Sequence, residues 1–200
     1  QHTKMLSSHY QKNPHLIEYS TIGYIFSLSS LTKAYIQNKN HSKALETVEV
    51  LEGCINKYNI NNSPNISARV FFYSINNRLD IYLNNDHYNE CRKLIEARNK
   101  EFEKFKLFIG KPLLYECYFL MTKYYFVVGE YKMALNYTNI IINDLSFKVR
   151  EDLLSVIRLI NLLIYFELNT DFTLGYLTKN TYRYFTKRKK LYKVENELIK

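Results

Sequence analysis

The sequence predicts an all-α fold made of about four helical hairpins that stack into a solenoid. Of the 200 residues, 5 are Gly and 3 are Pro, whereas sheet-rich folds draw on both for their many turns. Hydrophobic residues make up 46% of the chain and aromatic residues 16%, a composition that excludes disorder over most of its length. In addition, one type of segment recurs four times, as in a helical repeat protein.

Each recurring segment has an aromatic residue near the end of an apolar stretch, then a polar turn, then a small residue early in the next stretch. The aromatic residues are Tyr35, Tyr82, Tyr125 and Phe166. The small residues are Ala44, Cys91, Ala134 and Gly175, which are 47, 43 and 41 residues apart. We expect the small residues to let two antiparallel helices approach closely and the rings to fill the space between them. One hairpin cannot bury both of its faces alone, so neighbouring hairpins stack.

Helix-start and helix-stop residues divide the chain further. Asn13 and Ser63, each followed by Pro, are predicted N-caps, and Gly110 is predicted to end a helix. Helices are expected near residues 14–38, 41–58, 64–84, 87–109, 112–128, 131–143, 147–168 and from 172 onward. The whole chain, 1–200, is interpreted as one repeat domain with hairpins at 14–58, 64–109, 112–144 and 147–187. Residues 188–200 are expected to cap the stack or to begin a further helix.

These segments resemble tetratricopeptide (TPR) repeats, most closely at residues 128–135, Val-Gly-Glu-Tyr-Lys-Met-Ala-Leu. The resemblance covers residues 24–182, with a repeat longer than the usual ~34 residues. It implies a right-handed solenoid that binds a peptide or protein on a concave face lined by the first helix of each hairpin. The groove residues carried over by this resemblance are Phe26, Ser29, Lys33, Tyr73, Asn76, Asp80, Glu116, Phe119, Lys123, Ile157, Ile160 and Ile164.

The sequence offers no candidate catalytic residue, cofactor site or metal site. The five histidines form no pair at ligand spacing, and the glycine-rich and nucleophile motifs are absent. His41 and His87 occupy equivalent turns, which favours a structural role. Cys54, Cys91 and Cys117 form no CxxC pair and are expected to be small buried residues. We therefore expect that the chain is not an enzyme.

Two features suggest partners. The fourth groove set, Ile157, Ile160 and Ile164, is aliphatic and is expected to be covered by the basic tail helix, by a part of the protein missing from this chain or by a second copy. The chain has a net charge of +9, and Lys187, Arg188, Lys189 and Lys190 form a basic tail patch. A solvated helix face is the simplest interpretation of this patch, while an acidic protein, nucleic acid and anionic lipid remain alternatives. No apolar run reaches the ~20 residues of a membrane span.

These observations favour a protein-interaction scaffold. Because the chain begins with Gln1 and not with Met, we expect it to be part of a longer protein. The alternative function is therefore a sensor or regulatory module, transcriptional or signalling, whose output domain lies elsewhere in that protein. A cytoplasmic location is favoured.

Overall fold

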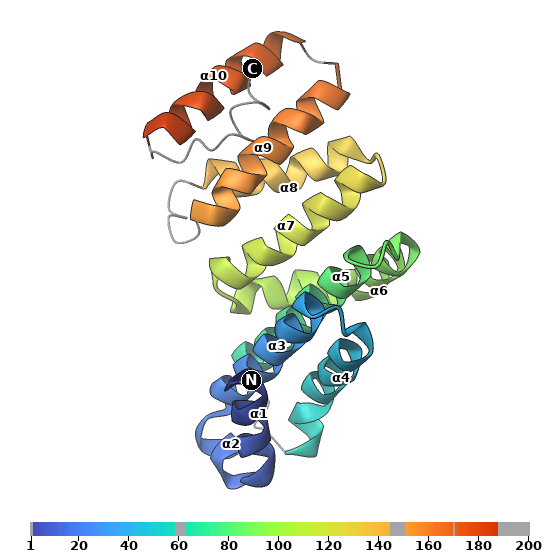
Figure 1. Cartoon of the computed structure of the whole chain (residues 1–200), viewed down its shortest axis with the longest axis vertical. Helices are drawn as coiled ribbons and strands as arrows, with labels where there is room; N and C mark the ends of the chain where they lie inside the picture. The colour runs from blue at the N-terminus through green and yellow to red at the C-terminus, as the bar shows by residue number, and fades with distance from the viewer. Residues whose placement is uncertain (1, 59–62, 145–150, 170, 188–200) are drawn as a thin grey trace. The chain divides into compact units, whose positions relative to one another are not determined.

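A computed structural model gives the fold of the chain and describes residues 2–58, 63–144, 151–169 and 171–187 (Figure 1). The described residues form α-helices and one short 3-10 helix, with no strand among them, which confirms the all-α prediction. The helices are α1 (His2–Lys12), α2 (His15–Tyr19), α3 (Thr21–Gln37), α4 (His41–Lys57), α5 (Pro64–Leu83), α6 (Tyr88–Phe105), η1 (Lys106–Phe108), α7 (Lys111–Val127), α8 (Tyr131–Asn143), α9 (Glu151–Glu167) and α10 (Asp171–Lys187).

The chain divides into two compact units, Gln1–Cys117 and Tyr118–Lys200, with the boundary inside α7. In the first unit, α1 and α2 pack on α3, α3 pairs with α4, and α5 contacts both of these helices and α6. In the second unit, Tyr137 of α8 packs against Tyr118 and Tyr125 of α7, and α9 contacts both α8 and α10. Each unit is therefore built from helices that are neighbours, or next but one, in sequence.

The turn between the two helices of each hairpin follows one backbone pattern. Two residues before the second helix begins, each turn has a residue with a positive φ angle. These residues are Lys39 (φ 56°), Asp86 (55°), Gly129 (78°) and Asn169 (51°). In the first three turns the next backbone N–H donates to the carbonyl five residues earlier, on Tyr35, Tyr82 and Tyr125, at 2.8–2.9 Å. This is the Schellman arrangement, which satisfies the last carbonyls of a helix. The repeat seen in the sequence is thus a repeated helix ending.

The turns fix which small residue belongs to each hairpin. Ala44, Cys91 and Ala134 each stand five residues after the residue with positive φ, and each is completely buried. These three predictions are confirmed. In the fourth hairpin the same position is Leu174, which packs in the core between α9 and α10.

The predictions for Gly175 and Phe166 are wrong by one residue. A Cβ added to Gly175 would meet no atom within 4 Å, so this glycine allows no close approach of helices. Phe166 is 63% exposed, and the residue four before Asn169, where the other hairpins have their tyrosine, is Tyr165. Two adjacent aromatic residues made the sequence pattern ambiguous here, and the turn geometry resolves it.

Most predicted helix limits agree with the structure, but the helix expected at 14–38 is interrupted at Ser20 (φ −135°, ψ 51°). A helix that no sequence pattern predicted, α1, contacts the chain at this break: Tyr10 Oη donates to Ser20 Oγ at 3.2 Å. Gly23 makes room for this contact, because a Cβ there would lie 2.6 Å from the Tyr10 hydroxyl. Helix α1 thus docks where α3 begins.

The two predicted N-caps have different outcomes. Ser63 is confirmed, since its Oγ accepts from the N–H of Ile66 at 3.3 Å and Pro64 begins α5. Asn13 is not an N-cap: its side-chain amide donates to the carbonyl of His9 at 3.0 Å, at the end of α1. Gly110 lies just before α7, after η1 has extended the chain beyond α6.

Candidate partner-binding face

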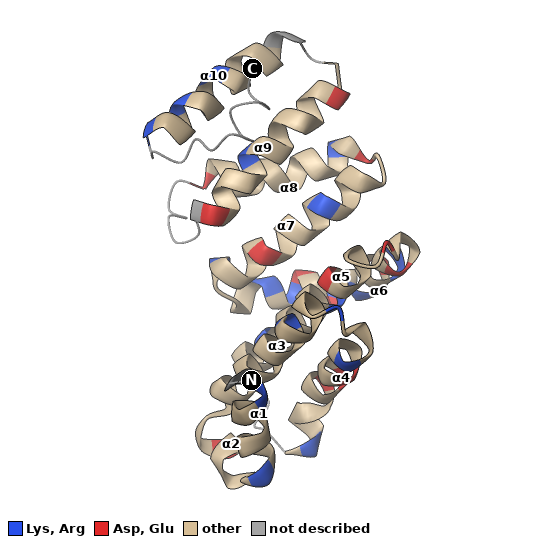
Figure 2. Cartoon of the chain, viewed as in Figure 1, with Lys and Arg blue, Asp and Glu red and all other residues tan. Residues whose placement is uncertain are grey.

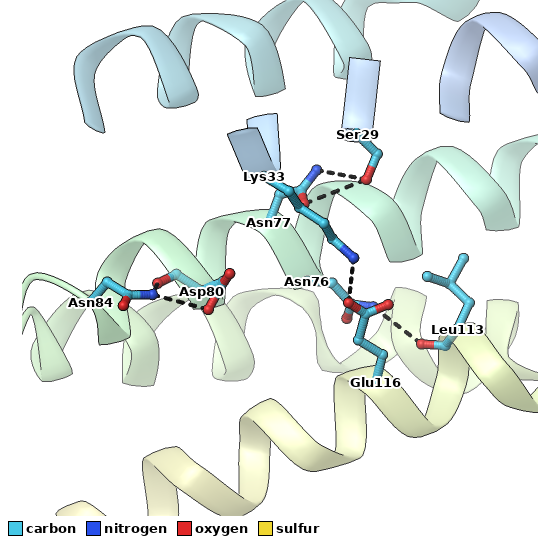
Figure 3. A network of polar contacts seen from close by, with 8 residues as sticks. All are labelled: Ser29, Lys33, Asn76, Asn77, Asp80, Asn84, Leu113 and Glu116. Carbon is cyan, nitrogen blue, oxygen red and sulfur yellow. Dashed lines mark hydrogen bonds and ion pairs between the residues drawn. The ribbon is translucent and has the colours of Figure 1, made fainter. Parts of the chain in front are cut away.

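The predicted groove residues of the first unit come together on α3, α5 and the start of α7. The rings of Phe26 and Tyr73 lie 6.5 Å apart at 67°, an edge-to-face contact between α3 and α5. Phe26 is 56% exposed and Tyr73 is half-buried. Lys33, two helical turns after Phe26 on α3, pairs with Glu116 in the polar network of Figure 3, and Glu116 lies close enough to Tyr73 to raise its pKa. We call Phe26, Tyr73, Lys33 and Glu116 the α3–α5 face.

Polar side chains tie the three helices of this face together (Figure 3). Lys33 Nζ lies 2.5 Å from Glu116 Oε1, which joins α3 to α7. Asn77 Nδ2 donates to Ser29 Oγ at 3.1 Å, which joins α5 to α3. Asn76 Nδ2 donates to the carbonyl of Leu113 at 3.1 Å, which joins α5 to α7. These links connect residues up to 83 positions apart in sequence.

Not every predicted groove residue can meet a partner. Ser29 and Asn76 are each 2% exposed, so they pack the helices together and present no surface, and their assignment as groove residues is corrected. Asp80 accepts from the side chain of Asn84 at 3.0 Å, at the end of α5. The pKa of Tyr73 is raised by burial, lowered by the positive charge of Arg69 and raised by the negative charge of Glu116, so both charges lie near its ring. The face therefore presents aromatic rings beside charges of both signs.

In the second unit some predicted groove residues are half-buried and others are completely buried. Lys123 Nζ lies 5.9 Å above the ring of Phe119, one turn away on α7, and both side chains are half-buried. Ile157 and Ile164 are completely buried, so the expected exposed aliphatic groove there is wrong. Between them in sequence and on the same side of α9 lies Asn161, whose Oδ1 accepts from Thr138 of α8 at 3.0 Å.

The reason for this correction is that α8 packs against that side of α9. Of the three isoleucines, Ile160 alone is half-buried, and it lies between the exposed side chains of Val156 and Leu163. Self-association through Ile157, Ile160 and Ile164 as a set is therefore contradicted, because two of the three side chains are unavailable.

The basic tail patch is described in part. Lys187 is exposed at the end of α10, whereas Arg188, Lys189 and Lys190 lie outside the described residues. Lys179 and Arg183 are also exposed and stand at four-residue intervals with Lys187, so the three share one side of α10. After Asp171, its first residue, the charged residues of α10 up to Lys187 are all basic, and they are blue in Figure 2.

The three cysteines lie in the interior of the described structure. Cys54, Cys91 and Cys117 are buried and unpaired with one another, and burial raises the pKa of Cys54 and of Cys91 to about 11, which leaves them protonated near neutral pH. Across residues 2–58, 63–144, 151–169 and 171–187, no cluster of three His, Cys, Asp or Glu side chains is arranged to hold a metal. Nor does any helix in those ranges have the length and apolarity to cross a membrane.

A second polar site, which no sequence pattern indicated, lies between α4, α5 and α6. Glu52 of α4 accepts two hydrogen bonds from Arg78 of α5, from Nε at 2.9 Å and from Nη2 at 2.6 Å. Ser74 also donates to Glu52. These partners lie 22 and 26 residues from Glu52 on another helix, and no sequence motif announces such a pairing.

Comparison of the chain with protein-family models, with curated proteins and with solved structures finds no match.

Proposed function

We propose that this chain is a TPR-like helical repeat, a right-handed solenoid of hairpins, that binds a peptide or protein partner through the α3–α5 face. The observation that carries the proposal is the exposed edge-to-face pair of Phe26 and Tyr73 beside the charged pair of Lys33 and Glu116. Aromatic residues are enriched in interface centres, where they supply most of the binding energy.

The polar links behind this face support the proposal. Ser29, Asn76 and Asn77 are buried and bonded between helices, so they hold α3, α5 and the start of α7 in a fixed arrangement. A face that is rigid before binding loses less conformational entropy when a partner docks. Phe26 gains from this because its ring is held against Tyr73 while more than half of its surface stays exposed.

Selection from a random peptide display library tests the proposal. We expect peptides that bind the wild-type chain and lose affinity for Phe26→Ala by about 30-fold or more, the effect of losing an aromatic hot spot worth about 2 kcal/mol. Because Phe26 is largely exposed, its truncation should leave the melting temperature near that of the wild type.

Val50→Ala is the matched control, since Val50 is exposed on α4 and is not part of the α3–α5 face. Selected peptides that bind Phe26→Ala as tightly as the wild type, or that lose affinity equally for Val50→Ala, would contradict the proposal.

A further inference from the structure

A cavity of about 410 Å³ in the first unit lies beside the polar site of Glu52, Ser74 and Arg78. Its floor is a stripe of α5 formed by Ser67, Val70, Phe71 and Ser74. One wall comes from α4 and the other from α6, and both of these helices pack on α5. The wall residues are Glu52, Ile55 and Asn56 on α4 and Arg98, Glu101 and Phe105 on α6. Its volume falls within the range of small-molecule pockets, roughly 300–1,000 Å³.

The α4 wall carries a fixed negative charge. The Glu52 carboxylate is held by Arg78 and Ser74. Burial raises the pKa of this carboxyl, but the hydrogen bonds from Arg78 and Ser74 outweigh burial and hold it below its usual value. Three donors occupy the carboxylate, and two oxygens offer about four acceptor positions. Glu52 thus keeps one acceptor position for a ligand, and its side chain is 30% exposed.

The α6 wall carries the guanidinium of Arg98 beside the carboxylate of Glu101. The guanidinium of Arg98 lies 5.1 Å from the centroid of the Phe71 ring, and its Nε lies 2.6 Å from Glu101 Oε2. The guanidinium thus lies between an aromatic ring and a carboxylate. Among the described residues, none bonds to its two terminal nitrogens, so the end of the fork that fits a carboxylate is open. The Arg98 side chain is 35% exposed.

These two charges face one cavity without pairing with each other. Arg98 is close enough to lower the pKa of Glu52, yet among the described residues each has its ion pair with a different partner, Arg78 for Glu52 and Glu101 for Arg98. Opposite charges on facing walls, above a floor in which Val70 and Phe71 lie between two serines, match a small ligand with an ammonium group, a carboxylate and an apolar side chain.

We propose that this cavity binds a small zwitterion of the amino-acid class, a free apolar amino acid or a short apolar peptide. The ligand's carboxylate meets the open fork of Arg98, its ammonium meets the free acceptor position of Glu52, and its side chain packs on Val70, Phe71 and Phe105. This site is separate from the α3–α5 face and uses none of its four residues. The failure of either proposal therefore leaves the other intact.

Titration of the isotope-labelled chain with L-leucine, L-phenylalanine and the dipeptide Leu-Leu, followed by backbone NMR, tests the proposal. We expect saturable shifts at Glu52–Asn56, Ser67–Ser74 and Arg98–Phe105, the segments that line the cavity. Tighter binding of the dipeptide identifies short peptides as the ligand, and tighter binding of an amino acid identifies free amino acids. No saturable shift in these segments at millimolar ligand would overturn the proposal.

Two blocked derivatives test each charge separately. Leucinamide lacks the carboxylate and N-acetyl-leucine lacks the ammonium, so each should bind at least tenfold more weakly than L-leucine. Equal binding of either derivative would contradict the contact that it removes.

Arg98→Gln should weaken the binding of the best ligand at least tenfold, while Lys93→Gln, which removes an exposed charge from the same helix, should not change it. If Arg98→Gln does not fold, the blocked derivatives still decide the question on the wild-type chain. Equal affinity in folded Arg98→Gln and wild type would refute the assignment of Arg98.

Discussion

Two substitutions of glycine by alanine should have opposite effects, because the same added methyl group meets different backbones. Gly129 adopts φ +78° in the turn between α7 and α8, whereas Gly175 lies inside α10, and an added Cβ meets no atom within 4 Å at either position. Packing is therefore not the deciding factor. At position 129 the alanine backbone must adopt the left-handed conformation, which costs about 1–2 kcal/mol for a residue with a Cβ.

At Gly175 the outcome follows from helix propensity. Alanine is more favourable than glycine by about 0.8–1 kcal/mol inside a helix, so Gly175→Ala should stabilise the chain by about that amount. For a chain of this size, 1 kcal/mol corresponds to roughly 2–4 °C in melting temperature. The expected difference between the two variants is thus about 4–12 °C, with Gly129→Ala below the wild type and Gly175→Ala above it.

Thermal and urea unfolding followed by circular dichroism measure both variants, with Gly53→Ala as control because Gly53 lies in α4 with open space around its Cβ. The control should behave like Gly175→Ala. Destabilisation by Gly175→Ala would restore Gly175 as the residue of close helix approach and would refute the one-residue shift of the fourth hairpin. Stabilisation by Gly129→Ala would refute the turn geometry.

Three further predictions concern the core, the loss of stability at acid pH and the basic side of α10. Ala134→Glu places a charge at a completely buried position, so it should destabilise the second unit by several kcal/mol; an unchanged unfolding midpoint would contradict the hairpin register. Glu52→Gln should lower the free energy of unfolding by about 1–2 kcal/mol at pH 7. The pKa of Glu52 is lowered from 4.5 in the folded chain, so the stability that this carboxylate contributes is present above that pH and is lost as the pH falls. The urea midpoint of the variant should therefore vary less between pH 5 and pH 3 than that of the wild type. A variant with glutamine at Lys179, Arg183 and Lys187 should bind RNA or DNA more weakly and with a flatter salt dependence; wild-type chain that shows no affinity for either at low salt would exclude nucleic acid as the partner of this patch.

The first three hairpin turns could be predicted because their signal is local. An aromatic residue, a polar turn and a small residue nine positions after the aromatic (Tyr35 to Ala44, for example) lie within about ten residues of each other, and a Schellman ending depends on these same residues. The fourth turn was misplaced because Tyr165 and Phe166 both satisfy the aromatic position. The positive φ angle of Asn169 shows that Tyr165 takes this position, and a backbone angle cannot be read from the sequence.

The parts that sequence analysis missed depend on contacts between distant residues. Helix α1 contacts the break in the predicted 14–38 helix through Tyr10, Ser20 and Gly23, and Asn13-Pro14 stands between α1 and α2, so it follows one helix and precedes another. The burial of Ile157 and Ile164 depends on how α8 lies against α9, which an apolar pattern leaves undecided because a buried stripe and an exposed groove have the same composition. The facing of Glu52 and Arg98 across a cavity likewise requires three helices in place.

Site-specific photo-crosslinking tests the proposed function most directly. The photoreactive amino acid p-benzoyl-phenylalanine is incorporated in place of Phe26 in one variant and in place of Val50 in another, and both are irradiated in cells that naturally contain the protein. The α3–α5 face as a partner-binding surface predicts a discrete adduct at position 26, lost with Tyr73→Ala and absent at position 50. An adduct at position 50 without one at position 26 would contradict the proposal.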